Sequence, residues 1–209
     1  MKIVGITGGV GAGKSEVMRL LTELLSDRCY ILIADEAAHQ VEKKGEDCYD
    51  RLVELMSKDI LSEDGEIDKG AFAAKLFSDP TLREQVNSIV HPAVKRYIRK
   101  EIERQLREGK TQWFFIEAAL LIEDGYEAIC DELWYVWASE EVRRKRLSES
   151  RGYSREKIDH IFASQNTEEI FRAHCQVVIE NNGELSETKR QLLAALSEER
   201  GSLSESWKR

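Results

Sequence analysis

Residues 2–15 read KIVGITGGVGAGKS, and this stretch decides the fold. The run 2–7 is short and apolar at Ile3, Val4 and Ile6, which predicts a buried strand. Residues 8–15 fit the pattern G-x-x-x-x-G-K-[ST] in full. Residues 14–25 then carry apolar side chains on one stripe, which predicts a helix. A buried strand, a glycine-rich loop and a helix in this order indicate a phosphate-binding loop rather than an ordinary tight turn.

The glycine-rich loop has the chemistry of an anion site. Glycines allow backbone N–H groups to point inward, and the following helix adds its N-terminal dipole. That dipole contributes only about 0.3–1 kcal/mol, which is too little for a triphosphate. We therefore expect Lys14 to reach the β- and γ-phosphates and the Ser15 hydroxyl to ligate Mg²⁺. The predicted ATP site is formed by Gly8, Gly9, Val10, Gly11, Ala12, Gly13, Lys14 and Ser15.

The remaining pattern predicts an α/β fold with a parallel five-stranded sheet of the P-loop NTPase type, flanked by helices. Strands are expected at 2–7, 30–34, 112–117, 133–138 and 176–180. Helices are expected at 14–25, 35–44, 48–57, 68–77, 80–107 with an interruption near His91-Pro92, 140–173 with a break at 151–154, and 185–196. The opening strand–helix–strand order is a βαβ unit, which predicts a right-handed crossover.

The strands and helices suggest a division into domains. The block 46–109 is highly charged and has no predicted strand, so we interpret it as an inserted helical substrate domain. The helical segment 141–173 is interpreted as a lid and 201–209 as a flexible tail. The nucleotide-binding core is predicted to comprise 1–45, 110–140 and 174–200.

Composition limits the choice of partners. The chain has 209 residues, 33% charged and 42% hydrophobic, with a net charge of −8, which argues against nucleic acid as the main partner. No apolar run is long enough to cross a membrane, and the N-terminus lacks the features of a signal peptide. The cysteines form no C-x-x-C pair, so reduced thiols of a cytoplasmic protein are favoured over a zinc site. They are Cys29, Cys48, Cys130 and Cys175.

Asp35 follows the second predicted strand. Ligands of parallel α/β sheets bind beyond the carboxyl ends of the strands, so Asp35 is expected to face the same crevice as the loop. A carboxylate there can orient and deprotonate an attacking hydroxyl, and a loose transition state demands little proton removal until late. The alternative is that Asp35 caps the helix over 36–44.

A basic cluster follows the fourth predicted strand. Arginines on a movable lid can close over ATP and stabilise charge on the transferring group. Arg146 and Arg151 are the catalytic candidates, whereas Arg143 and Arg144 are expected on the solvated face.

Several other polar residues have two interpretations each. Glu117 ends the third strand, where it could support Mg²⁺ through water or bind substrate. His91 could contact a substrate phosphate or ribose, or pack at a bend in its helix. The run Asn181-Asn182-Gly183 follows the last predicted strand and could contact a nucleobase, with Asn182 as the candidate residue, or form a simple Asn-Gly turn. No N-K-x-D signal of GTPases occurs. The other histidines, His39, His160 and His174, are interpreted as structural.

The ordered set of motifs resembles the bacterial dephospho-coenzyme A kinase family from about residue 2 to residue 196. The motifs that carry the resemblance are GITGGVGAGKS at 5–15, ADEAA at 34–38 followed by Gly45, DGEID at 64–68, VHP at 90–92, EAALLIEDG at 117–125, Gln165, and VIENNG at 178–183. The phosphate-binding loop is common to many families. The His91-Pro92 pair and Leu120-Leu121-x-Glu123 are much more specific.

The resemblance implies transfer of the ATP γ-phosphate to the 3′-hydroxyl of dephospho-coenzyme A. It implies a nucleotide-binding core, a helical substrate domain and a lid, and it extends the ATP loop to Glu16. It also identifies Asp35 as the base. The family often has D-A-D where this chain has Ile33-Ala34-Asp35, so the first of the two acids is missing. The role of the base is therefore assigned to Asp35 alone.

Other departures concern neighbouring positions. Glu117 replaces a usual aspartate, Ala119 a usual proline, and Glu16 a common threonine. The spacing from Arg146 to Arg151 is one residue longer than usual, which leaves open which arginine meets ATP.

Two alternative functions remain open from the sequence. A nucleoside or nucleoside-monophosphate kinase would share the core and the lid. A nucleotide-sensing switch would bind ATP and a protein partner without needing an acceptor site. Under the leading hypothesis the partners are small molecules, ATP and dephospho-coenzyme A, and the protein is a monomer or a weak homo-oligomer.

Overall fold

The computed structural model describes the backbone of residues 1–206 and the side chains of residues 1–197. The chain forms two compact units, one comprising residues 1–31 and 110–209 and the other residues 32–109. The predicted helical insertion therefore lies within the second unit, and the predicted lid lies within the first. Of the predicted tail, residues 201–206 belong to the last helix, and 207–209 lie outside the described residues.

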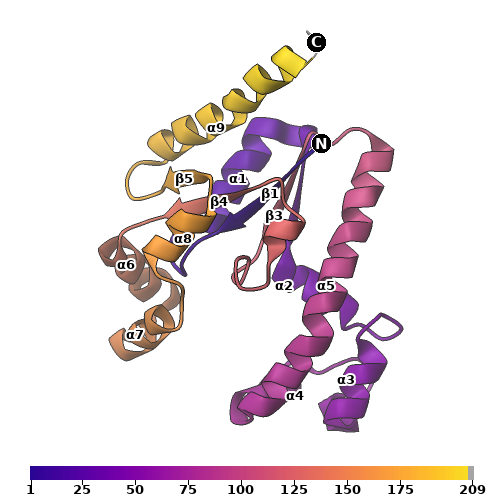
Figure 1. Ribbon diagram of the computed structural model, residues 1–209. Coiled ribbons are helices and arrows are strands. Elements are labelled where there is room, and N and C mark those ends of the chain that lie inside the picture. The colour runs from indigo at the N-terminus through magenta and orange to yellow at the C-terminus, as the bar shows by residue number, and fades with distance from the viewer. Residues whose placement is uncertain (207–209) are drawn as a thin grey trace. The chain divides into compact units, whose positions relative to one another are not determined.

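A five-stranded sheet has the order β2-β3-β1-β4-β5, and all of it except the last two residues of β2 belongs to the first unit (Figure 1). Its strands are β1 (Lys2–Thr7), β2 (Cys29–Ile33), β3 (Trp113–Glu117), β4 (Glu132–Trp137) and β5 (Val177–Glu180). β1 pairs in parallel with β3 and β4, and β4 pairs in parallel with β5. The register sets Ile6 beside Glu117, so the ends of β1 and β3 lie together. The predicted parallel α/β sheet is confirmed.

The middle of the sheet is apolar on both faces. Val4, Ile6, Phe114 and Trp134 have no exposed surface. Phe115 and Trp134 pack edge to face with their ring centroids 5.8 Å apart. Strands that read as continuous apolar runs are buried on both faces in this way, which is why periodicity located them well.

Helices of the first unit flank the sheet (Figure 1). They are α1 (Lys14–Leu25), α6 (Glu140–Arg151), α7 (Arg155–Ala163), α8 (Glu168–His174) and α9 (Leu185–Ser206). Short 3₁₀ turns occur at η1 (Ser26–Arg28) and η3 (Tyr126–Ala128). α1 packs against α9, and α8 packs on β4. α9 extends beyond the predicted end at Leu196.

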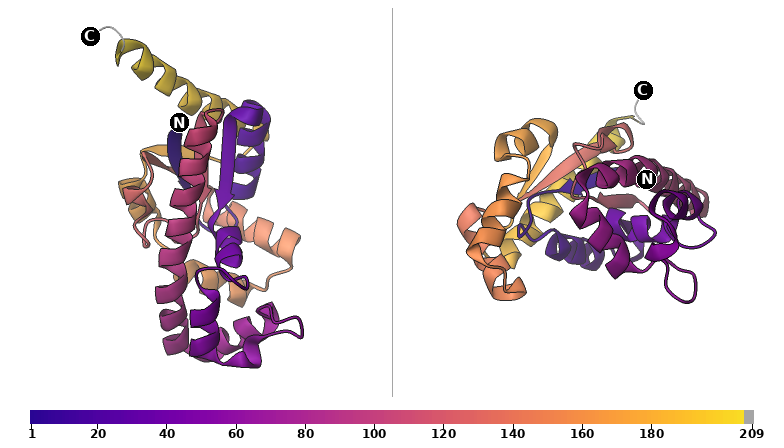
Figure 2. Two further views of the ribbon diagram at one scale, coloured as in Figure 1. Left: turned by 90° about the vertical axis from the view of Figure 1, so that its right-hand side faces the viewer. Right: turned by 90° about the horizontal axis from the view of Figure 1, so that it is seen from below.

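The second unit is built on one long helix. Its elements are α2 (Ala34–Val41), α3 (Tyr49–Met56), η2 (Lys58–Ile60), α4 (Lys69–Ser78) and α5 (Pro80–Glu108). α2, α3 and α4 all pack against α5 (Figure 2). Within 46–108, all of which is described, the only β-type pairing is an isolated antiparallel bridge between Leu61 and Ile67, in agreement with the predicted absence of strands.

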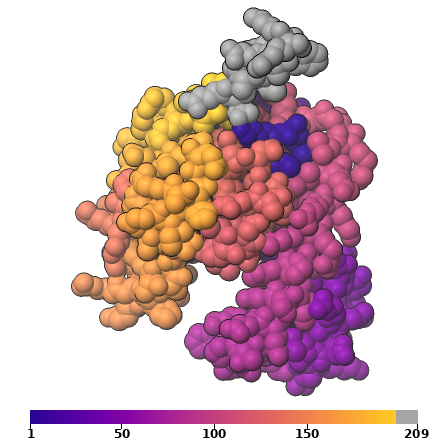
Figure 3. All heavy atoms as spheres, in the orientation of Figure 1, coloured from indigo at the N-terminus to yellow at the C-terminus, as the bar shows by residue number. Residues whose placement is uncertain are grey.

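α4 is the most exposed helix of the second unit. Asp68 caps it by accepting a hydrogen bond from the backbone N–H of Ala71 at 2.6 Å, as predicted. None of its residues is buried, and the atoms of this part of the chain lie at the surface in Figure 3. The helix therefore offers its side chains for contacts outside the core.

The predicted interruption near His91-Pro92 is wrong. α5 runs without a break from Pro80 to Glu108, with Pro92 inside it. A proline removes the hydrogen bond to the carbonyl four residues earlier, which favours a kink. The residues around it, Val90, Ala93 and Val94, are buried, and this packing keeps the helix continuous. Among the described residues, no helix has both the length and the apolar character needed to cross a bilayer.

Candidate functional site

The glycine-rich loop connects β1 to α1, and its backbone requires glycine at two positions. Gly8 has φ 145°, and a Cβ atom there would overlap the carbonyl of Val136. Gly13 caps α1 in the left-handed conformation with φ 94°, and a Cβ atom there would overlap the amide of Asn181. These conformations and close approaches explain why the pattern places glycine at each end of the loop.

Lys14 is the first residue of α1 and directly follows the glycine-rich loop. Its Nζ donates to the carbonyl of Gly8 at 2.8 Å and lies 3.5 Å from Oε1 of Glu117. The side chains of Lys14 and Glu117 are only 13% and 14% exposed, so this is a sheltered ion pair. The parallel register of β1 and β3 places Glu117 beside Ile6, at the end of the strand that leads into the loop. The structure thus brings together two predicted site residues that lie more than a hundred residues apart in the sequence.

The first turn of α1 carries two further predicted residues. Ser15 is exposed, so its hydroxyl is accessible at the helix start. Glu16 accepts hydrogen bonds from Arg19, one of them at 2.6 Å, and this pairing lowers the pKa of Glu16. The carboxylate of Glu16 is therefore engaged along the surface of α1.

Arg143 does not lie on the solvated face, and that prediction is wrong. Its Nε donates to the carbonyl of Val10 at 2.9 Å, and its guanidinium lies 4.1 Å from the ring centroid of Phe162. A Cβ atom on Gly9 would overlap the guanidinium, so Arg143 lies directly on the loop. Burial lowers the pKa of Arg143.

Gln165 completes this contact with the loop. Its Oε1 accepts from Nη2 of Arg143 at 2.6 Å and from the backbone N–H of Val10 at 3.2 Å. The backbone N–H and the carbonyl of Val10 are thus both hydrogen-bonded to side chains from the helical segment after β4. The sequence carried a signal for Arg143: it precedes the buried Leu147 by four positions, so the two share one face of α6.

Arg146 and Asn181 hold the next part of the loop. Arg146 donates to the carbonyl of Ala12 at 3.1 Å and to the carbonyl of Asn181 at 2.8 Å. The amide of Asn181 is buried and also donates to Ala12, at 2.8 Å, while its Oδ1 accepts from Thr188 at 3.0 Å. The sequence placed Asn181 only in a run that could contact a nucleobase, and its contact with the loop was not predicted. Its neighbour Asn182 is exposed, and its Oδ1 accepts from the backbone N–H of Ser139 at 2.8 Å.

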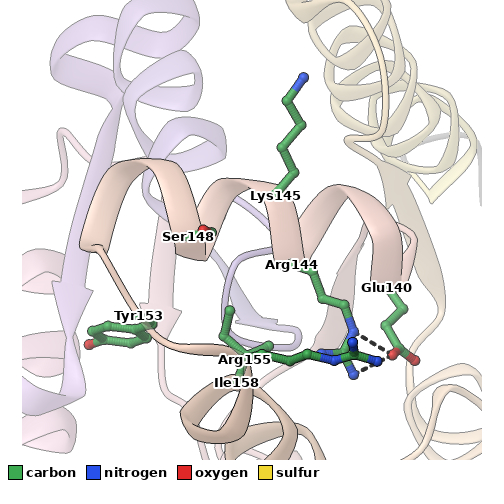
Figure 4. Close-up of a pocket in the computed structure, with 7 residues that line it drawn as sticks. All are labelled: Glu140, Arg144, Lys145, Ser148, Tyr153, Arg155 and Ile158. Carbon is green, nitrogen blue, oxygen red and sulfur yellow. Dashed lines mark hydrogen bonds and ion pairs between the residues drawn. The ribbon is translucent and has the colours of Figure 1, made fainter.

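The other arginines of the cluster are directed elsewhere. Arg151 is exposed, and its guanidinium lies 6.0 Å from the ring centroid of Tyr153. Arg144 pairs with Glu140 and Asp159, at 2.7 and 2.6 Å, and lines a cavity of about 470 Å³ between α6 and α7 (Figure 4). Of the two predicted catalytic arginines, only Arg146 contacts the loop through the interactions described.

The neighbouring arginines provide a matched pair for measuring the strength of the loop contact. Replacing Arg143 with alanine is expected to lower the free energy of unfolding by about 2–3 kcal/mol, because half-buried hydrogen bonds from a charged group are lost. Arg144→Ala removes exposed ion pairs with Glu140 and Asp159 and a longer contact with the Phe162 ring, at 4.9 Å, and is expected to lower the free energy of unfolding much less. Urea unfolding measures both. Equal losses for the two variants would show that the contact of Arg143 with Val10 contributes little.

Asp35 and His91 belong to the second unit. Asp35 lies in the first turn of α2, is exposed, and makes no cap hydrogen bond, so the alternative of a helix cap is wrong. Its expected orientation toward the loop stays a prediction. His91 is half-buried in α5.

Asp35 lines a cavity of about 650 Å³ within the second unit. Glu42 lines the same cavity, and its side chain is only 16% exposed. Burial raises the pKa of Glu42 to about 7, opposed by the charge of Lys69. Nδ1 of His39 lies 3.7 Å from its carboxyl group, so His39, interpreted as structural, also faces this cavity.

The raised pKa of Glu42 has a consequence for stability. The folded protein holds a proton on Glu42 up to about pH 7, whereas the unfolded chain releases it near its ordinary value of 4.5. Between these pH values the unfolded state binds fewer protons, so the free energy of unfolding falls as the pH rises, by up to about 3 kcal/mol in total.

Glu42→Gln removes this titration. We expect the difference in unfolding free energy between the native chain and this variant to move in favour of the variant between pH 5 and pH 8, as measured by urea unfolding. A difference that stays constant over that range would contradict the burial of an ionisable Glu42.

All four cysteines are free thiols. No group of three or more histidine, cysteine, aspartate or glutamate residues within the described part of the chain is arranged to hold a metal ion. Nδ1 of His174 contacts Glu127 at the surface, and His160 is exposed.

The parallel sheet, the glycine-rich loop and the sheltered lysine define a nucleotide-binding protein of the P-loop class. Comparison with known proteins then gives the family: the dephospho-CoA kinase family matches residues 2–187, and the chain belongs to it. The chain is 35% identical to the dephospho-CoA kinase of Carboxydothermus hydrogenoformans over 94% of this chain and 93% of that protein. It is 36% identical to that of Geobacillus kaustophilus over 93% and 95% of the two chains.

Solved structures show the same fold. The crystal structure of TT1252 from Thermus thermophilus is similar with a TM-score of 0.77 and 31% identity, covering 94% of this chain and 97% of that one. Dephospho-CoA kinase from Campylobacter jejuni has a TM-score of 0.68 at 19% identity, covering 95% and 97%, and supports the fold.

Proposed function

We infer that this chain is an ATP-dependent kinase that phosphorylates dephospho-CoA, giving CoA and ADP in CoA biosynthesis. The observation that carries this function is family membership over nearly the whole chain, combined with a phosphate-binding loop whose lysine is in place. The acceptor group on the substrate is the 3′-hydroxyl of its ribose.

The roles of the residues follow from phosphoryl-transfer chemistry. The inward-facing amides of the loop and Lys14 bind the β- and γ-phosphates, and Arg146 stabilises the negative charge on the phosphoryl group during its transfer. Asp35 orients the acceptor hydroxyl and takes its proton as the new P–O bond forms and the bond to ADP breaks. Glu117 holds Lys14 near the loop before ATP binds. Asn182 and His91 stay candidates for contacts to the nucleotide and the acceptor.

The residues at the loop fit a magnesium ion carried in with ATP. Mg²⁺ prefers oxygen ligands and is usually held by one or two protein groups together with substrate phosphates. The exposed hydroxyl of Ser15 and the carboxylate of Glu117 are oxygen donors of this kind. When bound, the ion neutralises charge on the phosphates. We also propose that the protein acts in the cytoplasm, which its four free thiols support.

Substrate comparison tests the function directly. Turnover with ATP is measured on dephospho-CoA, AMP, CMP and uridine at equal concentrations. We expect kcat/KM for dephospho-CoA to exceed that for each of the others by at least about 100-fold, which corresponds to roughly 3 kcal/mol of discrimination. Equal or greater activity on the nucleotides would replace this function with that of a nucleoside-monophosphate kinase, and ATP binding without any transfer would favour a sensing switch.

A further inference from the structure

The cavity in the helical unit has the size and lining of a small-molecule site. Its volume of about 650 Å³ falls within the range of ligand pockets, about 300–1,000 Å³. Ile67, Phe72 and Ala73 supply apolar lining, and charged or polar groups line the cavity beside them on the same segment and on the segment 35–43. An apolar surface beside a few polar groups suits a flat, partly polar ring.

One face of α2, continued by its C-cap residue Glu42, supplies part of this polar lining. Asp35, Ala38, His39 and Glu42 all line the cavity, and their spacing of three, four and seven residues places them on one side of a helix. At 1.5 Å per residue, Asp35 and Glu42 are about 10 Å apart along the helix axis. This separation is comparable to the length of a nucleoside, from the hydroxyls of its sugar to the far edge of its base.

We propose that this cavity takes the purine base of the acceptor nucleotide, with Glu42 pairing with the edge of the base that carries the 6-amino group. The inference rests on the proposed function, because it assumes that Asp35 meets the ribose hydroxyl. A base attached to that ribose lies along the face of α2 toward Glu42.

The charges of the lining favour the base over the diphosphate of the acceptor. Asp35, Glu42 and Glu66 line the cavity together with Lys43, Lys69 and His39, so the lining is mixed in charge and has no cluster of cations. A diphosphate gains little in such a site, whereas the amino group of adenine is a donor for a carboxyl oxygen. Glu66 accepts a hydrogen bond from the backbone N–H of Lys44 at 3.1 Å, and Asp35 is exposed. Glu42, with a side chain only 16% exposed, is therefore the carboxyl group that we assign to the base.

The protonation state of Glu42 is compatible with pairing to adenine. Burial keeps part of the population protonated near neutral pH, since it raises the pKa of Glu42 to about 7. A protonated carboxyl group has one donor and one acceptor side by side. Adenine presents an acceptor at its ring N1 and a donor at its 6-amino group, so both hydrogen bonds can form.

The test compares two acceptors across four forms of the protein. One acceptor is dephospho-CoA, and the other is the analogue in which hydrogen replaces the 6-amino group. For the native chain we expect kcat/KM to be about 10- to 100-fold lower on the analogue, because a buried acceptor then loses its donor. Glu42→Ala is expected to bring the two values within about threefold of each other, mainly by lowering the value for dephospho-CoA.

Two further variants complete the design. Glu42→Gln keeps a donor and an acceptor in the same shape, so it is expected to retain the preference for dephospho-CoA. Glu63→Ala removes an exposed carboxylate of the same unit that does not line the cavity, and it is expected to match the native chain. The affinity for ATP and the circular dichroism spectrum establish that each variant is folded.

The outcomes separate this inference from the proposed function. If Glu42→Ala transfers phosphate and keeps the native preference between the two acceptors, the assignment of Glu42 is wrong while the function stands. The same holds if the native chain does not distinguish the two acceptors. If the native chain transfers no phosphate to dephospho-CoA at all, the proposed function itself is wrong.

Discussion

Replacing Asp35 with asparagine is expected to lower kcat for transfer to dephospho-CoA by about 10²–10⁴-fold. Asparagine has the same shape and can still accept a hydrogen bond from the acceptor hydroxyl, but it cannot take the proton. Asp35 is exposed and makes no cap bond, so α2 does not depend on it. The dissociation constant for ATP is expected to stay within about twofold of the native value, since the loop that binds the phosphates lies in the other unit.

The neighbouring Glu36→Gln variant is the matched control. Glu36 is an exposed carboxylate in the same helical turn, and it does not line the cavity. We expect its kcat to equal that of the native chain. Rapid-quench measurement of a single turnover separates the chemical step from product release for all three proteins. A single-turnover rate for Asp35→Asn equal to the native rate would exclude Asp35 as the base.

The sheet and its first helix could be predicted from the sequence because their signals are local. β1 and α1 begin and end where periodicity placed them, and the other strands differ by a residue or two. Buried parallel strands are short apolar runs, and Gly13 marks the start of α1 through a backbone conformation that few other residues adopt.

The errors arise where packing outweighs local preference. Pro92 predicted an interruption, yet α5 is continuous because buried neighbours hold the helix on both sides of the proline. α9 extends beyond the last residue of its apolar pattern. Propensity and periodicity describe one segment at a time and carry no information on these contacts.

The site residues also divide into those that a local pattern predicts and those that only the tertiary structure brings to the loop. The loop and Lys14 are encoded in eight consecutive residues, so a pattern finds them. Arg143, Gln165 and Asn181 come from three separate segments and reach the loop only because β4, β5 and their connections are placed around β1. Gln165 and Asn181 lie within motifs of the family resemblance, but those motifs do not state that the side chains hold the loop, and for Arg143 only its spacing from Leu147 on α6 indicates a shared face.

These contacts prepare the loop for an anion. The carbonyl of Gly8 accepts from Lys14, that of Val10 from Arg143, and that of Ala12 from Arg146 and Asn181. Each carbonyl dipole is thus directed at a donor of the protein, so the oxygens do not oppose a phosphate. A preorganised site of this kind stabilises charge without reorganising when the substrate arrives.

Arg146 and Arg151 are expected to differ sharply when each is replaced by alanine. Arg146→Ala is expected to lower kcat on the order of 10³-fold, the lower end of what an arginine at a transferring phosphoryl group contributes. Arg151→Ala is expected to lower it less than about threefold, because an exposed arginine contributes little. Steady-state rates at saturating ATP and acceptor measure both variants.

Arg146→Lys separates the charge from the geometry. Arg146 donates to Ala12 and to Asn181 through two different nitrogens, at 3.1 and 2.8 Å, and a lysine ammonium cannot reproduce this planar fork. We therefore expect Arg146→Lys to recover no more than about tenfold of the lost rate. If Arg151→Ala shows the larger loss instead, the arginine that meets ATP is the exposed one beside Tyr153, and Arg146 only supports the loop.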